Sequence, residues 1–153
     1  IAEVVNQYHY QIIKNKLDLK LLLPDNASIL FHCDRGKLFH IVSNFINNAI
    51  KFTPESGQIF IRLNLDGENL KFEVEDTGIG IREEDHERIF ERFTQAENAL
   101  TKTYGGTGLG LAIVKELCDL MGCSTYLIST YKVGSTFGVT IPASLFEVIQ
   151  PIS

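Results

Sequence analysis

The sequence predicts an α+β fold, a two-layer α/β sandwich in which helices cover one face of a mixed, mostly antiparallel sheet. Alternating apolar and polar residues form paired segments separated by turn residues, which is typical of hairpin-linked strands. Segments with helical spacing interrupt these hairpins. Apolar residues make up 44% of the 153 residues and charged residues 22%, proportions that indicate one globular domain.

The first part of the chain alternates between helix and strand signals. Residues 1–14 carry apolar side chains at helical spacing, and two short apolar runs follow at 19–23 and 29–31, separated by a Pro-Asp-Asn turn. Asp34 stands where a helix would be capped, and that helix should extend to about Phe52, where Thr-Pro-Glu-Ser-Gly breaks it.

A hairpin and a long connection come next. Residues 58–65 alternate cleanly, Asp-Gly at 66–67 marks the turn, and 70–75 continue the alternation. Residues 76–108 are rich in glycine and charge, with only a brief helical signal near 85–93, so we expect a long mobile connection, and such loops are usually either functional or disordered.

The chain closes with a helix and a second hairpin. The helix begins near Leu109 and ends at Gly122, and strands are expected at 124–129 and 136–141. We expect residues 1–142 to form one domain. Residues 143–153 read as a C-terminal tail or linker.

Composition excludes several classes of function. The formal net charge is −5 with no basic run, so neither nucleic acid nor an anionic membrane is expected as a partner. No apolar stretch approaches the ~20 residues of a spanning helix. Cys33, Cys118 and Cys123 form no Cys-x-x-Cys pair, which indicates reduced thiols in a cytosolic protein.

The helix ending at Phe52 has an unusual polar side. Three Asn occur within five residues, although Asn is a poor helix former. Asn44, Asn48 and Lys51 project together, offering two amide oxygens and an ammonium group. This set suits a polyphosphate bound to Mg²⁺. A solvated helix face is the simpler alternative.

Two glycine-containing stretches add to this set. Asp76-Thr-Gly-Ile-Gly80 follows a strand directly; it is either a common turn or a carboxylate that accepts from the amino group of adenine. Gly105-Gly-Thr-Gly-Leu-Gly-Leu111 opens a helix, where exposed amides bind phosphate. It matches neither the dinucleotide fingerprint nor the P-loop.

These strings, in this order, resemble the sequence boxes of histidine kinases. They are similar to the N box (Asn44–Thr53), the G1 box (Asp76–Gly80), the F box (Ile89–Phe93), the G2 box (Gly105–Leu111) and the closing strand motif (Gly134–Phe137). The match covers about residues 1–142. The resemblance implies the Bergerat fold, with ATP between the helices and a flexible lid.

The resemblance also implies residue roles. Asn48 and Asn44 would hold Mg²⁺, Asp76 would accept from adenine with Thr136 behind it, and Phe90 and Phe93 would dock the lid or face another domain. The ATP-binding residues that it implies are Asn44, Asn48, Lys51, Phe52, Asp76, Gly78, Gly80, Ile81, Lys102, Gly106, Thr107, Gly108, Leu109, Gly110 and Thr136.

One position distinguishes a kinase from an ATPase. Gyrase-like relatives carry Glu as the general base where this chain has Asn44, and an amide does not take a proton at neutral pH. Many family members also carry a lid Arg where this chain has Gln95, which leaves Lys102 as the nearest basic residue. A degenerate binding module and a true ATPase remain the competing functions.

The acceptor histidine of the family is missing. His9, His32, His40 and His86 lie in no acceptor box, so we expect a histidine-containing dimerisation domain as partner and an isolated domain that is monomeric. The Phe-Thr-Gln-Ala-Glu run resembles hybrid sensor kinases, which implies a response regulator or receiver domain downstream. The resemblance places the domain in the cytoplasm, without membrane contact of its own.

Overall fold

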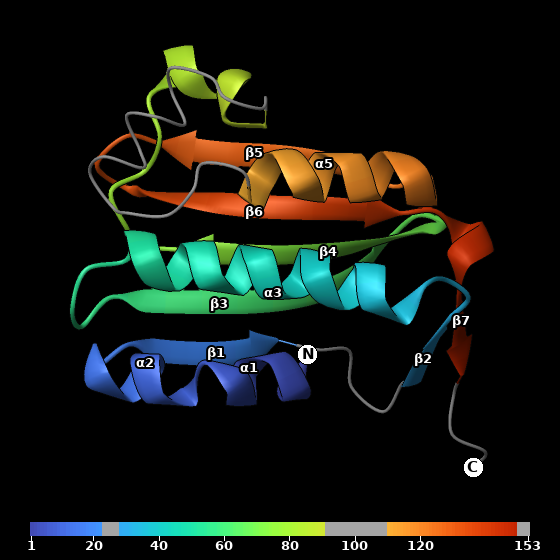
Figure 1. The fold of residues 1–153 in the computed structure, drawn as a ribbon, viewed down its shortest axis with the longest axis horizontal. Helices are drawn as coiled ribbons and strands as arrows, with labels where there is room; N and C mark the ends of the chain where they lie inside the picture. Colours follow the sequence, from blue (N-terminus) through green and yellow to red (C-terminus); the bar gives the residue numbers. More distant parts are fainter. Residues whose placement is uncertain (23–27, 91–109, 150–153) are drawn as a thin grey trace.

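The protein is a two-layer sandwich with a five-stranded sheet behind a row of helices (Figure 1). The computed structural model describes residues 1–22, 28–90 and 110–149. The strands lie in the order β1-β3-β4-β6-β5; β1 runs parallel to β3, and the other neighbours are antiparallel. Their bounds are β1 Asp18–Leu22, β3 Gln58–Asp66, β4 Asn69–Asp76, β5 Ser124–Thr130 and β6 Gly134–Ile141.

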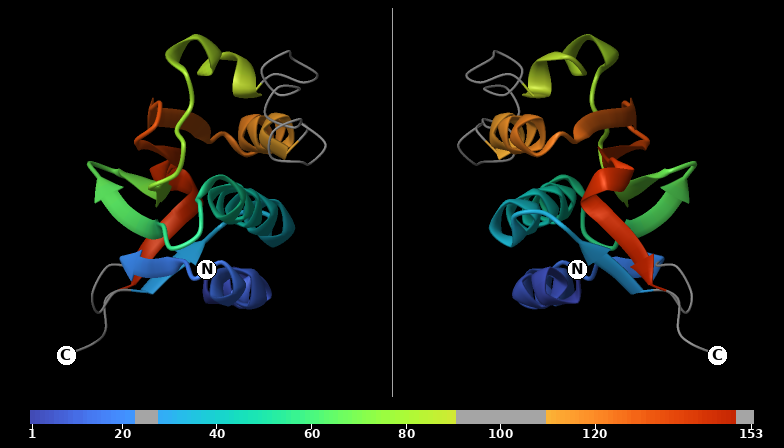
Figure 2. Two further views of the ribbon diagram at one scale, coloured as in Figure 1. Left: turned by 90° about the vertical axis from the view of Figure 1, so that its left-hand side faces the viewer. Right: turned by 90° about the vertical axis from the view of Figure 1, so that its right-hand side faces the viewer.

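The helices pack on one face of this sheet, as the side views show (Figure 2). They are α1 (Ala2–Gln7), α2 (His9–Lys14), α3 (Arg35–Phe52) and α5 (Gly110–Met121). The predicted fold class is therefore confirmed. The expected helix over residues 1–14 is instead broken at Tyr8, whose backbone leaves helical geometry at φ −102° and ψ 8°. The Tyr8 hydroxyl is 3.0 Å from Ser43 Oγ of α3.

The central helix α3 begins and ends where the sequence predicts. Asp34 caps it by accepting a hydrogen bond from the Lys37 backbone N–H at 3.0 Å. At the other end, the Thr53 hydroxyl donates to the Ala49 carbonyl at 2.6 Å. Between them, Phe45 is fully buried and stacks on Phe72 of β4 with ring centroids 6.4 Å apart. This contact joins the two layers at the middle of the core.

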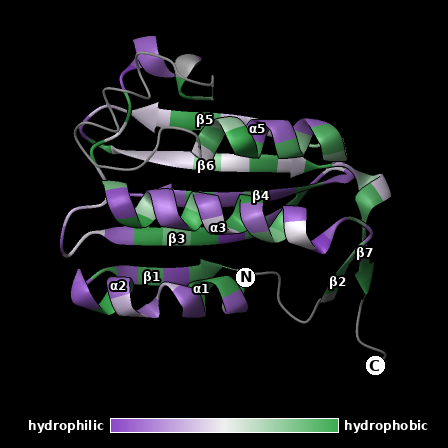
Figure 3. Ribbon diagram, viewed as in Figure 1, coloured by the Kyte–Doolittle hydropathy of each residue, from purple (hydrophilic) through white to green (hydrophobic). Residues whose placement is uncertain are grey.

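The sheet has one buried face, as its alternating sequence predicts. Figure 3 shows hydrophobic and hydrophilic residues interspersed along α3 and the central strands. The opposite face carries charged residues, among them Arg62 and Glu75, which form an ion pair at 2.6 Å. On the two central strands β3 and β4, the apolar residues of the buried face are Ile59, Ile61, Leu63, Leu70, Phe72 and Val74.

The segment expected as a tail is folded up to residue 149. A 3₁₀ turn, η3 (Ala143–Leu145), leads into β7 (Phe146–Ile149), which pairs antiparallel with β2 (Ser28–Phe31). Phe146 is only 8% exposed and belongs to the core. Burial of this ring is the physical reason that the chain does not leave the domain after residue 142.

The first part of the expected loop is also more ordered than its sequence suggests. Two 3₁₀ turns, η1 (Glu83–Asp85) and η2 (Arg88–Phe90), stand in place of the helical signal near residues 85–93. Ile89 is fully buried, and the Phe90 ring meets Phe137 of β6 edge-on with centroids 6.5 Å apart. Residues 91–109, which hold the rest of the expected loop, lie outside the described residues.

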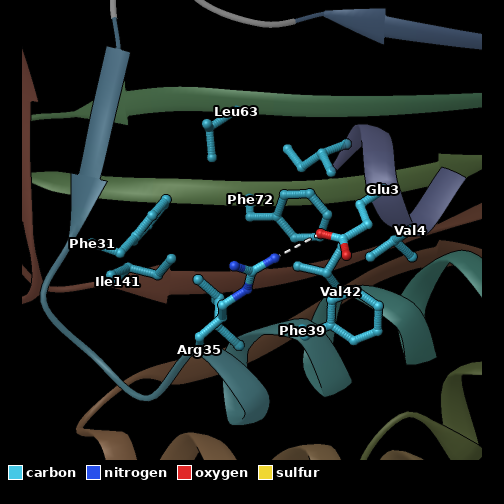
Figure 4. Close-up of a pocket in the computed structure, with 11 residues that line it drawn as sticks. Glu3, Val4, Phe31, Arg35, Phe39, Val42, Leu63, Phe72 and Ile141 are labelled. Carbon is cyan, nitrogen blue, oxygen red and sulfur yellow. Dashed lines mark hydrogen bonds and ion pairs between the residues drawn. The ribbon is translucent and has the colours of Figure 1, made fainter.

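A cavity of about 220 Å³ lies between α1, α3 and the sheet (Figure 4). Its wall includes the buried side chains of Val42 and Phe72. At its exposed side, Arg35 donates to Glu3 at 2.8 Å. Among the described residues, no helix is both long enough and apolar enough to cross a membrane.

Candidate functional site

A buried carboxylate marks the end of β4. Asp76 is the last residue of the strand and only 2% exposed. Its Oδ1 accepts a hydrogen bond from the Gly78 backbone N–H at 2.9 Å. Its Oδ2 is buried and has no partner among the described residues. A buried oxygen of this kind is costly unless something binds it, so the position is a candidate for a ligand with an N–H donor.

Burial also changes the acidity of Asp76. Loss of solvation raises the pKa of the carboxyl from 3.8 to about 6, and the neighbouring charge of Glu75 adds to the rise. The backbone N–H groups of Gly78 and Ser135 act in the opposite direction. With a pKa of about 6, Asp76 is mainly ionised at pH 7 and offers acceptor oxygens only.

The two glycines after Asp76 let the chain pass close to its neighbours. A Cβ on Gly78 would overlap the backbone carbonyl of Phe52 at the end of α3. Gly80 has a φ of +71°, and a Cβ there would overlap the Thr130 carbonyl at the end of β5. Only glycine satisfies both positions, so the loop after β4 is held between α3 and the β5–β6 hairpin.

The polar side of α3 faces the beginning of α5. Asn48 Nδ2 donates to Asn44 Oδ1 at 3.2 Å, and both side chains are half-buried. A Cβ on Gly110, the first residue of α5, would lie 2.9 Å from Asn44 Nδ2. Lys51 is exposed one turn after Asn48. An amide pair, an ammonium group and a helix N-terminus are thus gathered on one side of the sandwich.

Comparison with known proteins decides the family. The family model described as "Histidine kinase-, DNA gyrase B-, and HSP90-like ATPase" matches residues 33–145. The chain belongs to this family. The matched range contains Asp76, the Asn44–Asn48 pair and the whole of α5.

The relatives of this ATPase-family domain include sensor kinases of several kinds. It is 41% identical over 140 residues to the circadian input-output histidine kinase CikA of Synechococcus elongatus, covering 91% of this chain and 18% of CikA. It is 40% identical over 139 residues to hybrid signal transduction histidine kinase B of Dictyostelium discoideum, covering 88% of this chain and 7% of that protein. The chain therefore spans less than a fifth of either relative.

Solved structures agree with the family. Full-length ShkA in complex with AMPPNP has a TM-score of 0.80 and 28% identity, with 98% of this chain and 30% of ShkA covered. The nucleotide-free catalytic domain of histidine kinase ThkA has a TM-score of 0.79 and 28% identity, with 93% and 89% covered. ThkA in complex with response regulator protein TrrA matches with a TM-score of 0.74 and 27% identity, with 93% and 39% covered.

The structure brings predicted site residues together in two groups. Asp76, Gly78 and the end of α3 meet at the loop after β4, and the Asn44–Asn48 pair lies beside Gly110. Ile81 is 5% exposed. Phe52 is half-buried at the last turn of α3. Six of the predicted residues lie outside the described residues: Phe93, Lys102, Gly106, Thr107, Gly108 and Leu109.

Thr136 does not lie behind Asp76, where the sequence predicted it. The register of β4 and β6 pairs Asp76 with Ser135, and it pairs Thr136 with Glu75 on the opposite face of the sheet. Ser135, which is 6% exposed, is therefore the residue beside Asp76. Alternation could have revealed this, because Ser135 lies two residues before the buried Phe137 and must share its face.

Proposed function

We propose that this chain is the ATP-binding catalytic domain of a sensor histidine kinase. It binds Mg-ATP and transfers the γ-phosphoryl group to a histidine on a separate dimerisation domain, in the cytoplasm. The observation that carries the proposal is the buried Oδ2 of Asp76, which has no partner among the described residues; the amide pair of α3 accompanies it. Membership of the ATPase family and the ShkA complex with AMPPNP support it.

Base selection rests on Asp76. An ionised carboxylate only accepts hydrogen bonds, and its Oδ2 is the acceptor left over after Gly78 has taken Oδ1. The amino group of adenine would donate to it, whereas the carbonyl of guanine would face it with a second acceptor. Gly78 lies against Asp76 and the Phe52 carbonyl, so the base would lie against the loop after β4.

The α3 amides fit a magnesium ion that a triphosphate brings with it. Among the described residues, no cluster of three or more His, Cys, Asp or Glu could hold a metal ion. Asn44 and Asn48 supply neutral oxygen ligands, so phosphate oxygens and water would complete the coordination shell. When bound, Mg²⁺ would neutralise charge on the phosphates. Lys51 would contact a phosphate as a point charge, and the N-terminus of α5 would face the anion.

Asn44 cannot act as a general base, which disfavours hydrolysis of ATP and favours transfer to a protein group. Hydrolysis needs a base that takes a proton from water, and an amide does not do so near pH 7. The chain's own residues would bind and orient ATP, and the nucleophile would come from the partner's histidine. The solved complex of ThkA with TrrA supports a response regulator as the next partner in the signalling sequence.

Calorimetry on the purified chain tests the nucleotide part of the proposal. We expect Mg-ATP to bind and Mg-GTP to bind at least about tenfold more weakly, because a charge-assisted hydrogen bond is lost. Asp76→Asn should lower ATP affinity to a similar extent. Equal affinities for ATP and GTP in the wild-type chain would refute the role of Asp76.

A further inference from the structure

The loop after β4 is attached to the end of the β5–β6 hairpin. Residues 77–82 form neither helix nor strand, so contacts with other parts of the chain determine where they lie. The hairpin turns at residues 131–133, about 50 residues further along the chain. The two segments meet through contacts of four consecutive loop residues, 79–82, with residues 129–132, which we call the hairpin end.

Two of these contacts are made by the loop backbone. The Lys132 backbone N–H donates a hydrogen bond to the Ile79 carbonyl. Gly80 lies so close to the Thr130 carbonyl that a Cβ on this glycine would overlap it. The loop backbone therefore lies directly against the hairpin end, with no side chain between them at Gly80.

The Ser129 hydroxyl holds the next loop residue. Its oxygen accepts a hydrogen bond from the Ile81 backbone N–H at 2.8 Å, and its hydrogen is donated to the Gly134 carbonyl at 3.0 Å. Ile81 is only 5% exposed, so loss of this acceptor would leave its N–H without this partner in a buried place. One side chain of β5 thus joins the loop to both strands of the hairpin.

Arg82 adds a contact on the exposed side. Its guanidinium lies over the Tyr131 ring, 4.7 Å from the ring centroid, and its Nη2 donates to the Tyr131 hydroxyl at 3.4 Å. Both side chains are exposed, so we expect this contact to contribute less than the hydrogen bond between Ser129 and Ile81. Every residue from Ile79 to Arg82 therefore has a contact with the hairpin end.

We infer that the hairpin end is a positioning element that holds residues 79–82 in place for binding of the nucleotide base. The inference rests on the proposed function in taking the base to lie against the loop after β4. Ser129 and Tyr131 are positioning residues that act through Ile81 and Arg82. If the loop occupied its binding position only part of the time, the apparent affinity would fall by that fraction.

Removal of either side-chain attachment should weaken Mg-ATP binding. By calorimetry we expect about a tenfold loss of affinity in Ser129→Ala, because the Ile81 N–H loses its partner. A cation–π contact at an exposed site is weaker, so Tyr131→Ala should lose about threefold. Ser129→Thr keeps the hydroxyl and Tyr131→Phe keeps the ring, so both should bind nearly as the wild type does. Ser124→Ala, which removes an exposed hydroxyl from the same strand, is the matched control and should bind unchanged.

Two further measurements separate positioning from a general loss of stability. Phe146→Leu removes part of a core ring in β7 and should lower the stability of the chain, yet the folded chain should bind Mg-ATP unchanged. Amide hydrogen exchange of the nucleotide-free chain reports on the loop itself. The Ile81 amide should exchange about tenfold faster in Ser129→Ala than in the wild type.

Weaker ATP binding in Ser129→Ala and Tyr131→Ala, restored in the conservative variants, supports the inference. Unchanged affinity in Ser129→Ala despite faster Ile81 exchange overturns it, because the position of the loop would then not affect the nucleotide. Unchanged Ile81 exchange, or an equal loss of affinity in Phe146→Leu, overturns it as well. Failure of the wild-type chain to bind ATP would refute the proposed function and with it the role toward the base, while the exchange rates would still show whether the hairpin end holds the loop.

Discussion

Substitution of Asp76 by Asn should remove a pH dependence from the stability of the nucleotide-free chain. The pKa of Asp76 is raised from 3.8 to about 6, so the folded state holds this proton more tightly than the unfolded state does. Its stabilising effect is complete below pH 3.8 and is lost as the pH rises through 6. The pKa of Asp76 thus differs by roughly two units between the folded and unfolded states, which corresponds to about 3 kcal/mol of unfolding free energy. The side chain is 2% exposed, so solvent screening reduces this value little.

The assay is urea unfolding of both proteins between pH 4 and pH 8. The wild-type chain should lose about 2.4 kcal/mol relative to Asp76→Asn over this interval, because Asn does not ionise and all other groups are common to both. The rest of the effect lies below pH 4, where the carboxyl of the unfolded chain is still taking up its proton. Glu68→Gln, which removes one exposed carboxylate, controls for the change in net charge. Parallel stability profiles for the wild type and Asp76→Asn would refute the burial argument.

Three further substitutions test other parts of the structure. Gly80→Ala should lower the unfolding free energy by at least about 1 kcal/mol in urea titrations, because its Cβ would meet the Thr130 carbonyl at a positive φ; unchanged stability would contradict that contact. Val42→Ile should raise the unfolding free energy by about 0.5–1 kcal/mol by filling the cavity beside α1, and a loss of stability would mean that the space cannot take a methyl group. Asn48→Ala should weaken Mg-ATP binding in calorimetry while leaving stability within about 0.5 kcal/mol, since it lies on the polar side of α3; unimpaired binding would remove Asn48 from the metal site.

Local signals predicted the central part of the fold. The helix from Asp34 to Phe52 has its cap, its apolar stripe and its breaker within the segment itself, and the observed bounds agree. The β3–β4 hairpin is likewise encoded by alternation around one turn. The sequence also predicted that Asp76, Gly78 and Gly80 share one loop, because they are neighbours in the chain.

Features that depend on distant contacts were missed. The break at Tyr8 involves a hydroxyl contact to Ser43, which is 35 residues away in the chain. Residues 146–149 are a short run that becomes a strand only because β2 lies beside it. Ser135 was overlooked in favour of Thr136, since the register between β4 and β6 decides which of the two lies beside Asp76. Pairing partners cannot be found from periodicity alone.

Phosphoryl transfer is the most direct measurement of what the chain does. The isolated chain would be incubated with Mg²⁺ and γ-labelled ATP, with and without the histidine-containing dimerisation domain of its parent protein. The expected result is almost no phosphate release by the chain alone, since Asn44 offers no base, and an acid-labile label on the partner domain when it is present, lost in Asn48→Ala. Robust phosphate release by the isolated wild-type chain, without transfer to the partner, would show an ATPase and contradict the proposed kinase function.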